Sequence, residues 1–287
     1  MKIIVTGANG QLGMTFQDLS SQYPEYQFFF FGSEVLDITQ SNSITTVIDQ
    51  VKPEVVINCA AYTAVDKAED EPEKAFAVNA NGVKNLVHAC ENFNASLVHI
   101  STDYVFDGTK KEPYTEVDET NPINVYGESK LAGEKYLLAS NLKAIIIRTS
   151  WVYSEFGNNF VKTMLRLGKE RESLNVVNDQ FGSPTYAKDL ATAIFTVLNQ
   201  FELWSKEPII LHYSNIGVIS WFQFAEKIME MANLNCKMNP VNSDQYYSKA
   251  KRPISSSISN EKIIKCFGIS PVEWEKSLNK VIQKVIK

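Results

Sequence analysis

The sequence predicts an α/β protein in which a doubly wound parallel sheet is followed by a smaller C-terminal lobe that binds substrate. Over the first 150 residues, short apolar segments alternate with amphipathic ones, as they do in βαβ units. A turn with regularly spaced glycines follows the first apolar segment. The alternation becomes less regular after Trp151, which indicates a second part of different construction. The expected fold class is therefore a Rossmann-like sheet with an added lobe.

Five short segments rich in β-branched and aromatic residues are predicted to be strands buried on both faces. They cover residues 2–7, 26–31, 53–59, 96–101 and 143–150. The aromatic run from Phe28 to Phe31 is interpreted as a buried central strand rather than a ligand-binding cluster. A shorter strand is expected at 175–177 in the second part of the chain.

Helices are predicted where apolar residues recur at helical spacing. In the first part these ranges are 12–23, 40–51, 72–93 and 128–140, and in the second part 159–171, 186–200, 220–232 and 272–286. We expect residues 1–150 and about 178–205 to form a dinucleotide-binding domain. Residues 151–177 and about 206–287 are expected to form the substrate-binding lobe, which closes the cleft at the carboxyl ends of the strands.

Composition limits the classes of function. A formal net charge of −5 over 287 residues argues against nucleic acid as a partner, because phosphate backbones are bound by clustered Lys and Arg. No apolar run is long enough to span a membrane, and the N-terminus leaves no room for a secretory signal, so we expect a cytoplasmic protein. The 4 cysteines and 3 histidines show no metal-ligand spacing, so neither a metal site nor a disulfide framework is expected.

The turn "VTGANGQLG" places Gly7, Gly10 and Gly13 between the first strand and the next helix. At these positions glycine permits a tight turn, close approach of the backbone to a pyrophosphate, and close packing of helix on strand. The N-terminus of the helix then offers amide donors to the phosphates. The sequence therefore predicts a dinucleotide site. Gly32 and Ser33 occupy the expected tip of the second strand, where neither an acidic nor an arginine signature stands, so use of both NADPH and NADH is predicted.

Tyr126 and Lys130 are four residues apart and share one helical face. A neighbouring ammonium favours the phenolate, so Lys130 is expected to move the pKa of Tyr126 toward neutrality, where acid–base catalysis is efficient. Lys130 is also expected to hold the nicotinamide ribose. Thr102, just past the fourth strand, is expected to orient a substrate carbonyl while Tyr126 supplies its proton. Asp103 is expected either to raise the pKa of Tyr126 or to contact substrate hydroxyls.

The spaced glycines and the Y-x-x-x-K pair resemble those of the extended short-chain dehydrogenases/reductases. Over about 185 residues the chain more closely resembles the dTDP-4-dehydrorhamnose reductase family. The segments that carry this resemblance are "GQLG", "AAYTAVDKAEDEP", "STDYVFDG", "INVYGESKLAGEK", "RTSWVY", "GNNFVKTMLRL" and "NDQFGSPT". That family reduces the 4-keto group of dTDP-6-deoxy-L-lyxo-4-hexulose to give dTDP-L-rhamnose with NADPH or NADH.

The resemblance implies roles for individual residues. Tyr126 is the implied proton donor, Lys130 its partner and ribose ligand, and Thr102 the carbonyl-orienting hydroxyl. Cofactor contacts are implied for Gly10, Gln11, Leu12, Asp37, Ile38, Ala61, Tyr62 and Thr63. Contacts with a dTDP-linked 4-keto sugar are implied for Asp103, Tyr104, Trp151, Asn159 and Arg252, the last of these on the diphosphate. Family members with a magnesium-bridged dimer carry a glutamate soon after the glycine turn. Met14 and Thr15 stand there in this chain, so we predict no metal and a monomer or a homodimer.

Three alternatives remain at this point. The chain could reduce another nucleotide-linked 4-keto sugar, because pocket shape decides the substrate. It could be a noncatalytic regulatory subunit that binds a nicotinamide cofactor, although the retained Thr102, Tyr126 and Lys130 argue against this. A dehydratase or epimerase is disfavoured, because Tyr104 follows Asp103 where dehydratases carry a second acid.

Overall fold

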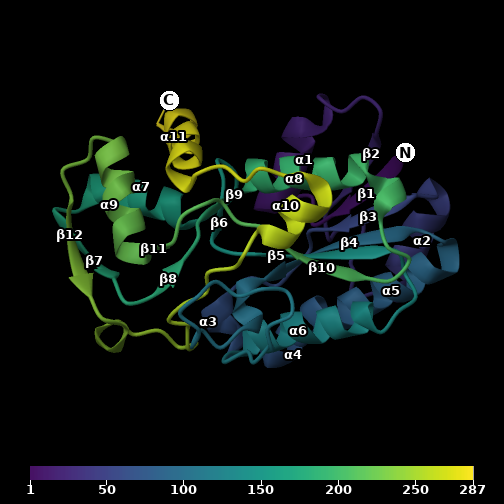
Figure 1. The fold of residues 1–287 in the computed structure, drawn as a ribbon, viewed down its shortest axis with the longest axis horizontal. Coiled ribbons are helices and arrows are strands. Elements are labelled where there is room, and N and C mark those ends of the chain that lie inside the picture. The colour runs from purple at the N-terminus through teal and green to yellow at the C-terminus, as the bar shows by residue number, and fades with distance from the viewer. Residues whose placement is uncertain (287) are drawn as a thin grey trace.

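The computed structural model describes residues 1–286 and contains a six-stranded parallel sheet (Figure 1). Its order is β10-β5-β4-β3-β1-β2. The strands are β1 (Lys2–Thr6), β2 (Gln27–Phe31), β3 (Val55–Asn58), β4 (Ser96–Thr102), β5 (Ala144–Thr149) and β10 (Ile209–His212). The chain leaves β1 toward β2 and then returns to the other side of β1, so the strand order reverses there. Ligands of open α/β sheets bind at such a reversal, outside the carboxyl ends of the strands.

Helices cover both faces of the sheet, which confirms the predicted doubly wound class (Figure 1). One face packs against α1 (Gln11–Ser20), α8 (Ala187–Asn199) and α10 (Glu261–Phe267). The other face packs against α2 (Ser41–Val51), α5 (Gly82–Phe93) and α6 (Val125–Leu138). These layers leave the carboxyl edge of the sheet free to form a site.

The predicted helix over residues 72–93 is interrupted. It consists of α4 (Pro72–Phe76), a π-helical stretch (Ala77–Asn81) and α5. Asn79 in the π-helical stretch donates a hydrogen bond of 3.0 Å to the Tyr62 carbonyl and another of 3.0 Å to Ser129 Oγ of α6. A Cβ on Gly133 of α6 would lie 2.2 Å from the Asn79 carbonyl oxygen, so α6 and this stretch are in direct contact. A wider helical turn here places the Asn79 side chain where it joins two other segments.

The interpretation of residues 28–31 as a central strand is wrong. β2 lies at the edge of the sheet and pairs with β1, and its phenylalanines are half-buried. One face of the strand is covered by aromatic packing, since the Phe28 ring lies 5.8 Å from the ring of Phe195 in α8. Aromatic residues suit a half-buried pleated surface as well as a central one, so the composition of the run did not separate the two positions.

Residues 209–212 were expected in the second lobe, but they form β10 in the main sheet and pair with β5. α10 packs beside β10, and Ile263 and Phe267 of α10 belong to the same core cluster as the sheet. The short apolar segment of β10 covers the free edge of β5, which explains why a segment distant in sequence returns to the sheet. The division into two folding domains stays a prediction.

The second lobe has its own core and lies at the left of Figure 1. It contains α7 (Phe160–Glu170), α9 (Trp221–Met231) and α11 (Trp274–Val285), with the parallel pair β7 (Ser173–Val177) and β12 (Lys237–Val241). Two short pairs link it to the sheet domain: β6 (Val152–Tyr153) with β9 (Thr185–Tyr186), and β8 (Phe181–Gly182) with β11 (Ile219–Ser220). None of the helices in residues 1–286 has the length and apolar character needed to cross a membrane.

A buried ion pair joins α6 to the sheet. Arg148 of β5 donates to Glu134 of α6, with Nη2 to Oε2 at 2.7 Å and Nε to Oε1 at 3.0 Å. Both side chains are almost fully excluded from solvent, and Ser101 of β4 donates to the same carboxylate. Loss of one partner would leave the other charge buried and uncompensated, which costs far more than loss of an exposed pair.

We expect Glu134→Gln to lower the free energy of unfolding by about 3–5 kcal/mol, since Arg148 would keep its charge without a partner. Glu170→Gln is the matched control, because Glu170 pairs with Arg166 at 2.8 Å on the exposed face of α7 and such pairs contribute about 0.3–0.5 kcal/mol. Urea unfolding of the two variants measures the difference. Equal stabilities would show that Glu134 does not hold α6 against the sheet.

Candidate active site

A cavity of about 690 Å³ opens at the carboxyl ends of the central strands. Its walls come from the glycine turn after β1, the segments after β3, β4 and β5, the first turns of α6, and the second lobe. The predicted site residues that line it are Gly10, Gln11, Leu12, Ala61, Thr63, Thr102, Asp103, Tyr104, Tyr126, Lys130, Trp151, Asn159 and Arg252. The fold therefore brings the three predicted catalytic residues and part of both predicted binding sets into one cleft.

The glycine turn has the geometry that its spacing predicted. Gly7 has φ +61, and a Cβ on it would lie 2.6 Å from the Ala60 nitrogen after β3. A Cβ on Gly13 would lie 2.4 Å from the Gly7 carbonyl oxygen, so α1 packs tightly on the turn. A Cβ on Gly10 would meet a single atom within 4 Å, the Gly7 carbonyl oxygen at 3.3 Å. Gly10 therefore presents bare backbone to the cleft at the N-terminus of α1.

Five predicted cofactor residues lie outside the lining of this cavity: Gly7, Gly13, Asp37, Ile38 and Tyr62. Asp37 accepts hydrogen bonds from the Thr39 amide and hydroxyl. Ile38 is buried, and a Cβ on Gly82 would lie 2.7 Å from its Cδ1. The Tyr62 hydroxyl donates to Glu71 at 3.0 Å. Binding roles for these side chains stay predictions.

Sequence reasoning missed an acidic side chain at the tip of β2. The Glu34 carboxylate folds back over Gly32 and accepts a hydrogen bond of 3.4 Å from Asn9 Nδ2 in the glycine turn. A Cβ on Gly32 would collide with it at 2.3 Å, so the missing side chain makes room for the carboxylate. From the sequence, only Gly32 and Ser33 were expected at the tip. The position of Glu34 two residues after a glycine, which leaves space for its side chain, could have indicated it.

Gln11 connects the glycine turn to the second lobe. Its Oε1 accepts hydrogen bonds from Ser154 Oγ at 3.1 Å and from Asn159 Nδ2 at 3.0 Å. Asn159 in turn caps α7, since its Oδ1 accepts from the Lys162 amide at 3.1 Å. Asn159 was predicted to bind substrate, whereas in this structure its side chain holds the two parts of the protein together beside the cleft.

α6 begins at Val125, three residues before the predicted start at 128, so Tyr126 lies in its first turn. Asn124 caps this turn through a 2.8 Å hydrogen bond from the Gly127 amide to its Oδ1. A Cβ on Gly127 would lie 2.2 Å from the Tyr104 carbonyl oxygen, so α6 lies directly against the segment after β4. Ser129 donates to the Tyr126 carbonyl at 2.8 Å and accepts from Asn79. These contacts fix the direction in which Tyr126 and Lys130 point.

The pKa of Tyr126 differs from the expectation. Burial raises it to about 12, the Thr102 hydroxyl lowers it, and the Asp103 carboxylate raises it further. Lys130 was expected to lower this pKa toward neutrality, but its ammonium donates to the Ile100 carbonyl at 2.6 Å. Burial lowers the pKa of Lys130 itself to about 8. The predicted lowering of the Tyr126 pKa by Lys130 is not found, whereas the Asp103 carboxylate raises this pKa, which is one of the two roles expected for it.

Two polar atoms in the cleft are buried without a hydrogen-bond partner in the protein, Asp103 Oδ2 and Thr149 Oγ1. Thr102 donates to the other Asp103 oxygen at 2.9 Å. Burial raises the pKa of Asp103 to about 7. Thr149 lies opposite Thr102 in the register of β4 and β5, and sequence reasoning did not select it. Unpartnered buried polar atoms are costly, so both are suited to contact a ligand.

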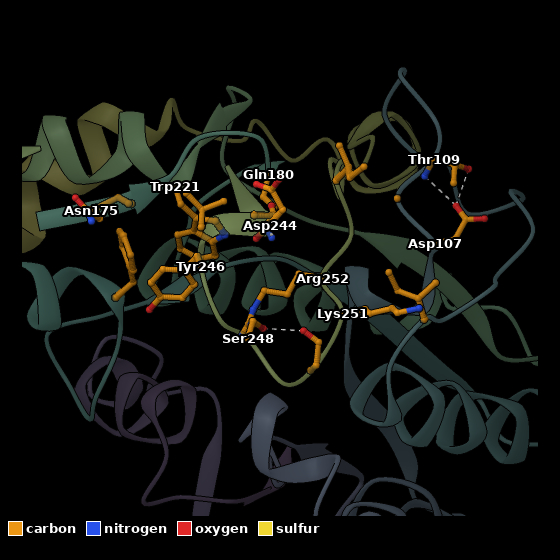
Figure 2. Close-up of a pocket in the computed structure, with 18 of the residues that line it drawn as sticks. Asp107, Thr109, Asn175, Gln180, Trp221, Asp244, Tyr246, Ser248, Lys251 and Arg252 are labelled. Carbon is orange, nitrogen blue, oxygen red and sulfur yellow. Dashed lines mark hydrogen bonds between the residues drawn. The ribbon is translucent and has the colours of Figure 1, made fainter. Parts of the chain in front are cut away.

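A second cavity of about 680 Å³ shares Trp221 and Arg252 with the first. Figure 2 shows that Trp221 and Tyr246 border it together with Asp107 and Thr109, which follow β4. Trp221, missed from the sequence, stacks on the predicted residue Trp151 with ring centroids 3.4 Å apart. The paired indoles offer a flat apolar wall at the junction of the two cavities.

Arg252 is held by a carboxylate in this structure. Its Nη2 donates to Asp66 Oδ2 at 2.7 Å and its Nη1 to Asp66 Oδ1 at 3.3 Å, and Nη1 also donates to Ser248. Asp66 belongs to α3 (Val65–Ala68) beside the cleft. A guanidinium already shaped around two carboxylate oxygens presents the geometry that a diphosphate needs. Among residues 1–286, no group of three or more His, Cys, Asp or Glu side chains is arranged to hold a metal ion.

A doubly wound sheet whose cleft joins a glycine turn to a tyrosine and a lysine on one helix is the construction of the short-chain dehydrogenases/reductases. The comparisons narrow this class. The family model described as RmlD substrate binding domain matches residues 1–287. The dTDP-4-dehydrorhamnose reductase of Aggregatibacter actinomycetemcomitans is 40% identical, with 98% of each chain covered.

Two similar solved structures belong to the same family. The dTDP-4-dehydrorhamnose reductase of Clostridium acetobutylicum is 40% identical with a TM-score of 0.94, and 100% of both chains is covered. That of Bacillus anthracis, solved in complex with NADP, is 41% identical with a TM-score of 0.92 over 99% of both chains. The chain therefore belongs to the dTDP-4-dehydrorhamnose reductase family and is an oxidoreductase.

We expect Gly127→Ala to destabilise the protein, although alanine favours helix by about 1 kcal/mol. The added Cβ would force α6 away from the Tyr104 carbonyl. Glu128→Ala at the neighbouring exposed position is the control and should change stability by about 0.5 kcal/mol or less. Thermal unfolding compares the two, and a Gly127→Ala protein as stable as wild type would mean that the helix does not need this close contact.

Proposed function

We propose that the protein catalyses the NAD(P)H-dependent reduction of the 4-keto group of dTDP-6-deoxy-L-lyxo-4-hexulose to dTDP-L-rhamnose. The observation that carries the proposal is the placement of Thr102, Tyr126 and Lys130 in the lining of one cleft, with Lys130 one helical turn from Tyr126. Family membership supports the reaction class and the nucleotide sugar. A nicotinamide cofactor bound in the cleft would supply the hydride.

Tyr126 is the proposed proton donor to the carbonyl oxygen. With its pKa raised to about 12 by burial, the phenol is protonated at neutral pH and can donate. Thr102 orients the same oxygen by a hydrogen bond. Asp103 is the proposed contact for a sugar hydroxyl, because its Oδ2 is buried and unpartnered. A ligand hydroxyl donating to this oxygen would remove the cost of its burial.

The cofactor is proposed to lie along the glycine turn. Gly10, Gln11 and Leu12 stand at the N-terminus of α1, where amide groups and the helix dipole favour a pyrophosphate. Ala61 and Thr63 line the cleft beyond β3, and Lys130 reaches it from α6 to hold the ribose. The NADP complex of the Bacillus anthracis relative supports a nicotinamide dinucleotide in this position.

The sugar nucleotide is proposed to extend from the catalytic residues into the second cavity. Tyr104 and the stacked Trp151 would face the sugar, and Arg252, at the junction of the two cavities, would meet the diphosphate. Asp66 would have to release part of its hold on Arg252 for the phosphates to enter.

The deciding experiment follows absorbance of NADPH, then of NADH, with purified protein and enzymatically prepared dTDP-6-deoxy-L-lyxo-4-hexulose. Cofactor oxidation with formation of dTDP-L-rhamnose is the expected result. Cofactor binding without oxidation would contradict it. A panel of other nucleotide-linked 4-keto sugars would then separate a different substrate from a noncatalytic role.

Tyr126→Phe removes the proton donor and keeps the ring. We expect kcat to fall by roughly 10²–10⁴ while cofactor affinity and the melting temperature stay near those of wild type. Tyr136→Phe is the matched control, because Tyr136 lies on the exposed face of the same helix. Steady-state kinetics of both variants provide the test, and near-normal turnover by Tyr126→Phe would remove Tyr126 from the mechanism.

Glu34→Gln tests cofactor choice. A carboxylate at the tip of β2 repels a 2′-phosphate, so its removal should improve the affinity for NADPH relative to NADH by about threefold to tenfold. Fluorescence titration with each cofactor gives the ratio, and Glu172→Gln in the second lobe is the control for loss of one exposed charge. An unchanged ratio in Glu34→Gln would show that the carboxylate does not face the ribose.

A further inference from the structure

Three polar side chains interrupt the apolar face of the sheet beneath α6. Thr6, Asn58 and His99 are register partners on β1, β3 and β4, so they lie side by side on one face of the sheet. The row two residues earlier on the same face is Ile4, Val56 and Leu97, all buried in the core beneath the helices. The polar row is also fully buried, with no exposed surface on any of the three residues. Burial of this kind is costly unless every polar atom has a defined partner.

The orientation of the Asn58 amide is fixed by the backbone. The Ala60 amide donates to Asn58 Oδ1 at 3.2 Å, and the Thr6 hydroxyl donates to the same oxygen at 2.7 Å. A flipped amide would set the Nδ2 donor against the Ala60 N–H, which is also a donor. Asn58 Nδ2 therefore points at His99 Nδ1, 3.1 Å away.

This contact determines the tautomer of His99. Asn58 donates, so His99 Nδ1 accepts, and the neutral ring carries its proton on Nε2. The ring is fully buried, and burial followed by the Lys130 charge keeps the pKa of His99 well below its usual value. The ring is thus neutral and presents an N–H to whatever lies beyond Nε2.

The group beyond Nε2 is Lys130 Nζ, 3.5 Å away. A lysine ammonium has three donors and no acceptor, so it gains no hydrogen bond from an N–H. One donor goes to the Ile100 carbonyl at 2.6 Å. The inward direction is blocked by His99, which leaves the remaining donors for the cleft that Lys130 lines.

We propose that Asn58 and His99 are positioning residues for Lys130: Asn58 sets the His99 tautomer, and the Nε2–H of His99 directs the ammonium donors of Lys130 into the cleft. This rests on the proposed function for the role of Lys130 toward the cofactor ribose. The row also accounts for three buried polar residues next to the apolar row of Ile4, Val56 and Leu97.

The other ionisable groups around Lys130 are few. Besides His99 of β4, Glu134 on α6 and Cys59 after β3 act on its charge, and both favour the ammonium. Burial opposes them and lowers the pKa of Lys130 to about 8. Tyr126 lies one turn away on α6. A change that turns the His99 lone pair toward Lys130 should therefore raise this pKa and draw one donor out of the cleft.

The tautomer is tested first, by NMR of the unliganded full-length protein with ¹⁵N-labelled histidine. The three histidines provide internal references. His212 has its Nδ1 3.1 Å from the Tyr114 carbonyl, an acceptor, so its proton is on Nδ1, and His88 is exposed. We expect His99 to carry its proton on Nε2, opposite to His212, without titrating between about pH 5 and 8. An Nδ1–H tautomer, or titration of His99 in that range, would overturn the proposal whether or not the protein is a reductase.

The consequence for Lys130 is tested with Asn58→Asp, since a carboxylate accepts a proton from His99 Nδ1 and leaves Nε2 as an acceptor. We expect the NMR tautomer to reverse, and the loss of NADPH affinity with rising pH to begin about one pH unit higher than in wild type. Thr6→Val removes a different hydrogen bond to Asn58 and leaves the tautomer unchanged, so its pH profile should match that of wild type.

A third variant separates the ring from a simple charge effect. In a His99→Phe background, Asn58→Asp should no longer move the pH profile, because no ring transmits the change. An equal shift in that background, or identical profiles for Asn58→Asp and Thr6→Val, would overturn the positioning role. The tautomer is read without cofactor or substrate, so failure of the reductase assay leaves that result standing and counts against the proposed reaction alone.

Discussion

The site depends on how closely α6 lies against the sheet. Gly127 and Gly133 remove the Cβ atoms that would otherwise collide with the carbonyl oxygens of Tyr104 and Asn79. The Glu134–Arg148 pair then holds the helix from the sheet side, in a region closed to solvent. Tyr126 and Lys130 occupy the same helix, so their positions are set by backbone contacts rather than by flexible side chains. Catalytic geometry built on such rigid elements is more exact than geometry built on loops.

The same close packing sets the charges of the site. Burial raises the pKa of Tyr126 and of Asp103, and it lowers the pKa of Lys130. Each shift favours the uncharged form, as expected where water is excluded. Against this background the polar row and the Glu134–Arg148 pair are joined by defined hydrogen bonds, and Arg148 Nη1 is left without a partner in the protein. Polar groups of the sheet layer are therefore concentrated beneath α6, the helix that carries Tyr126 and Lys130.

The regular strand–helix alternation of this structure could be predicted from the sequence, whereas several individual positions could not. Strand and helix periodicity, with the glycine turn, predicted the doubly wound sheet, and the Y-x-x-x-K spacing placed two residues on one helical face. The edge position of β2 was missed because an aromatic run suits any half-buried strand. The return of β10 to the sheet was missed because strand pairing over a long separation leaves no local pattern. Glu34 folds back over Gly32, and Trp221 lines both cavities. These positions depend on side-chain direction and on the packing of the second lobe, which periodicity does not record.

The electrostatics of the cleft keep the Tyr126 phenol protonated. A dehydrogenase that removes a proton from an alcohol needs a phenolate, which a lowered tyrosine pKa would provide. Here burial and the Asp103 carboxylate both raise the pKa of Tyr126. Because the pKa of Asp103 is about 7, its charge is gained as pH rises through neutrality, and the phenol is then held protonated more strongly. Binding of a cationic nicotinamide would oppose this effect, whereas the reduced, uncharged ring would not. The unliganded cleft therefore keeps Tyr126 in the protonated form, which is the form that the proposed reduction needs.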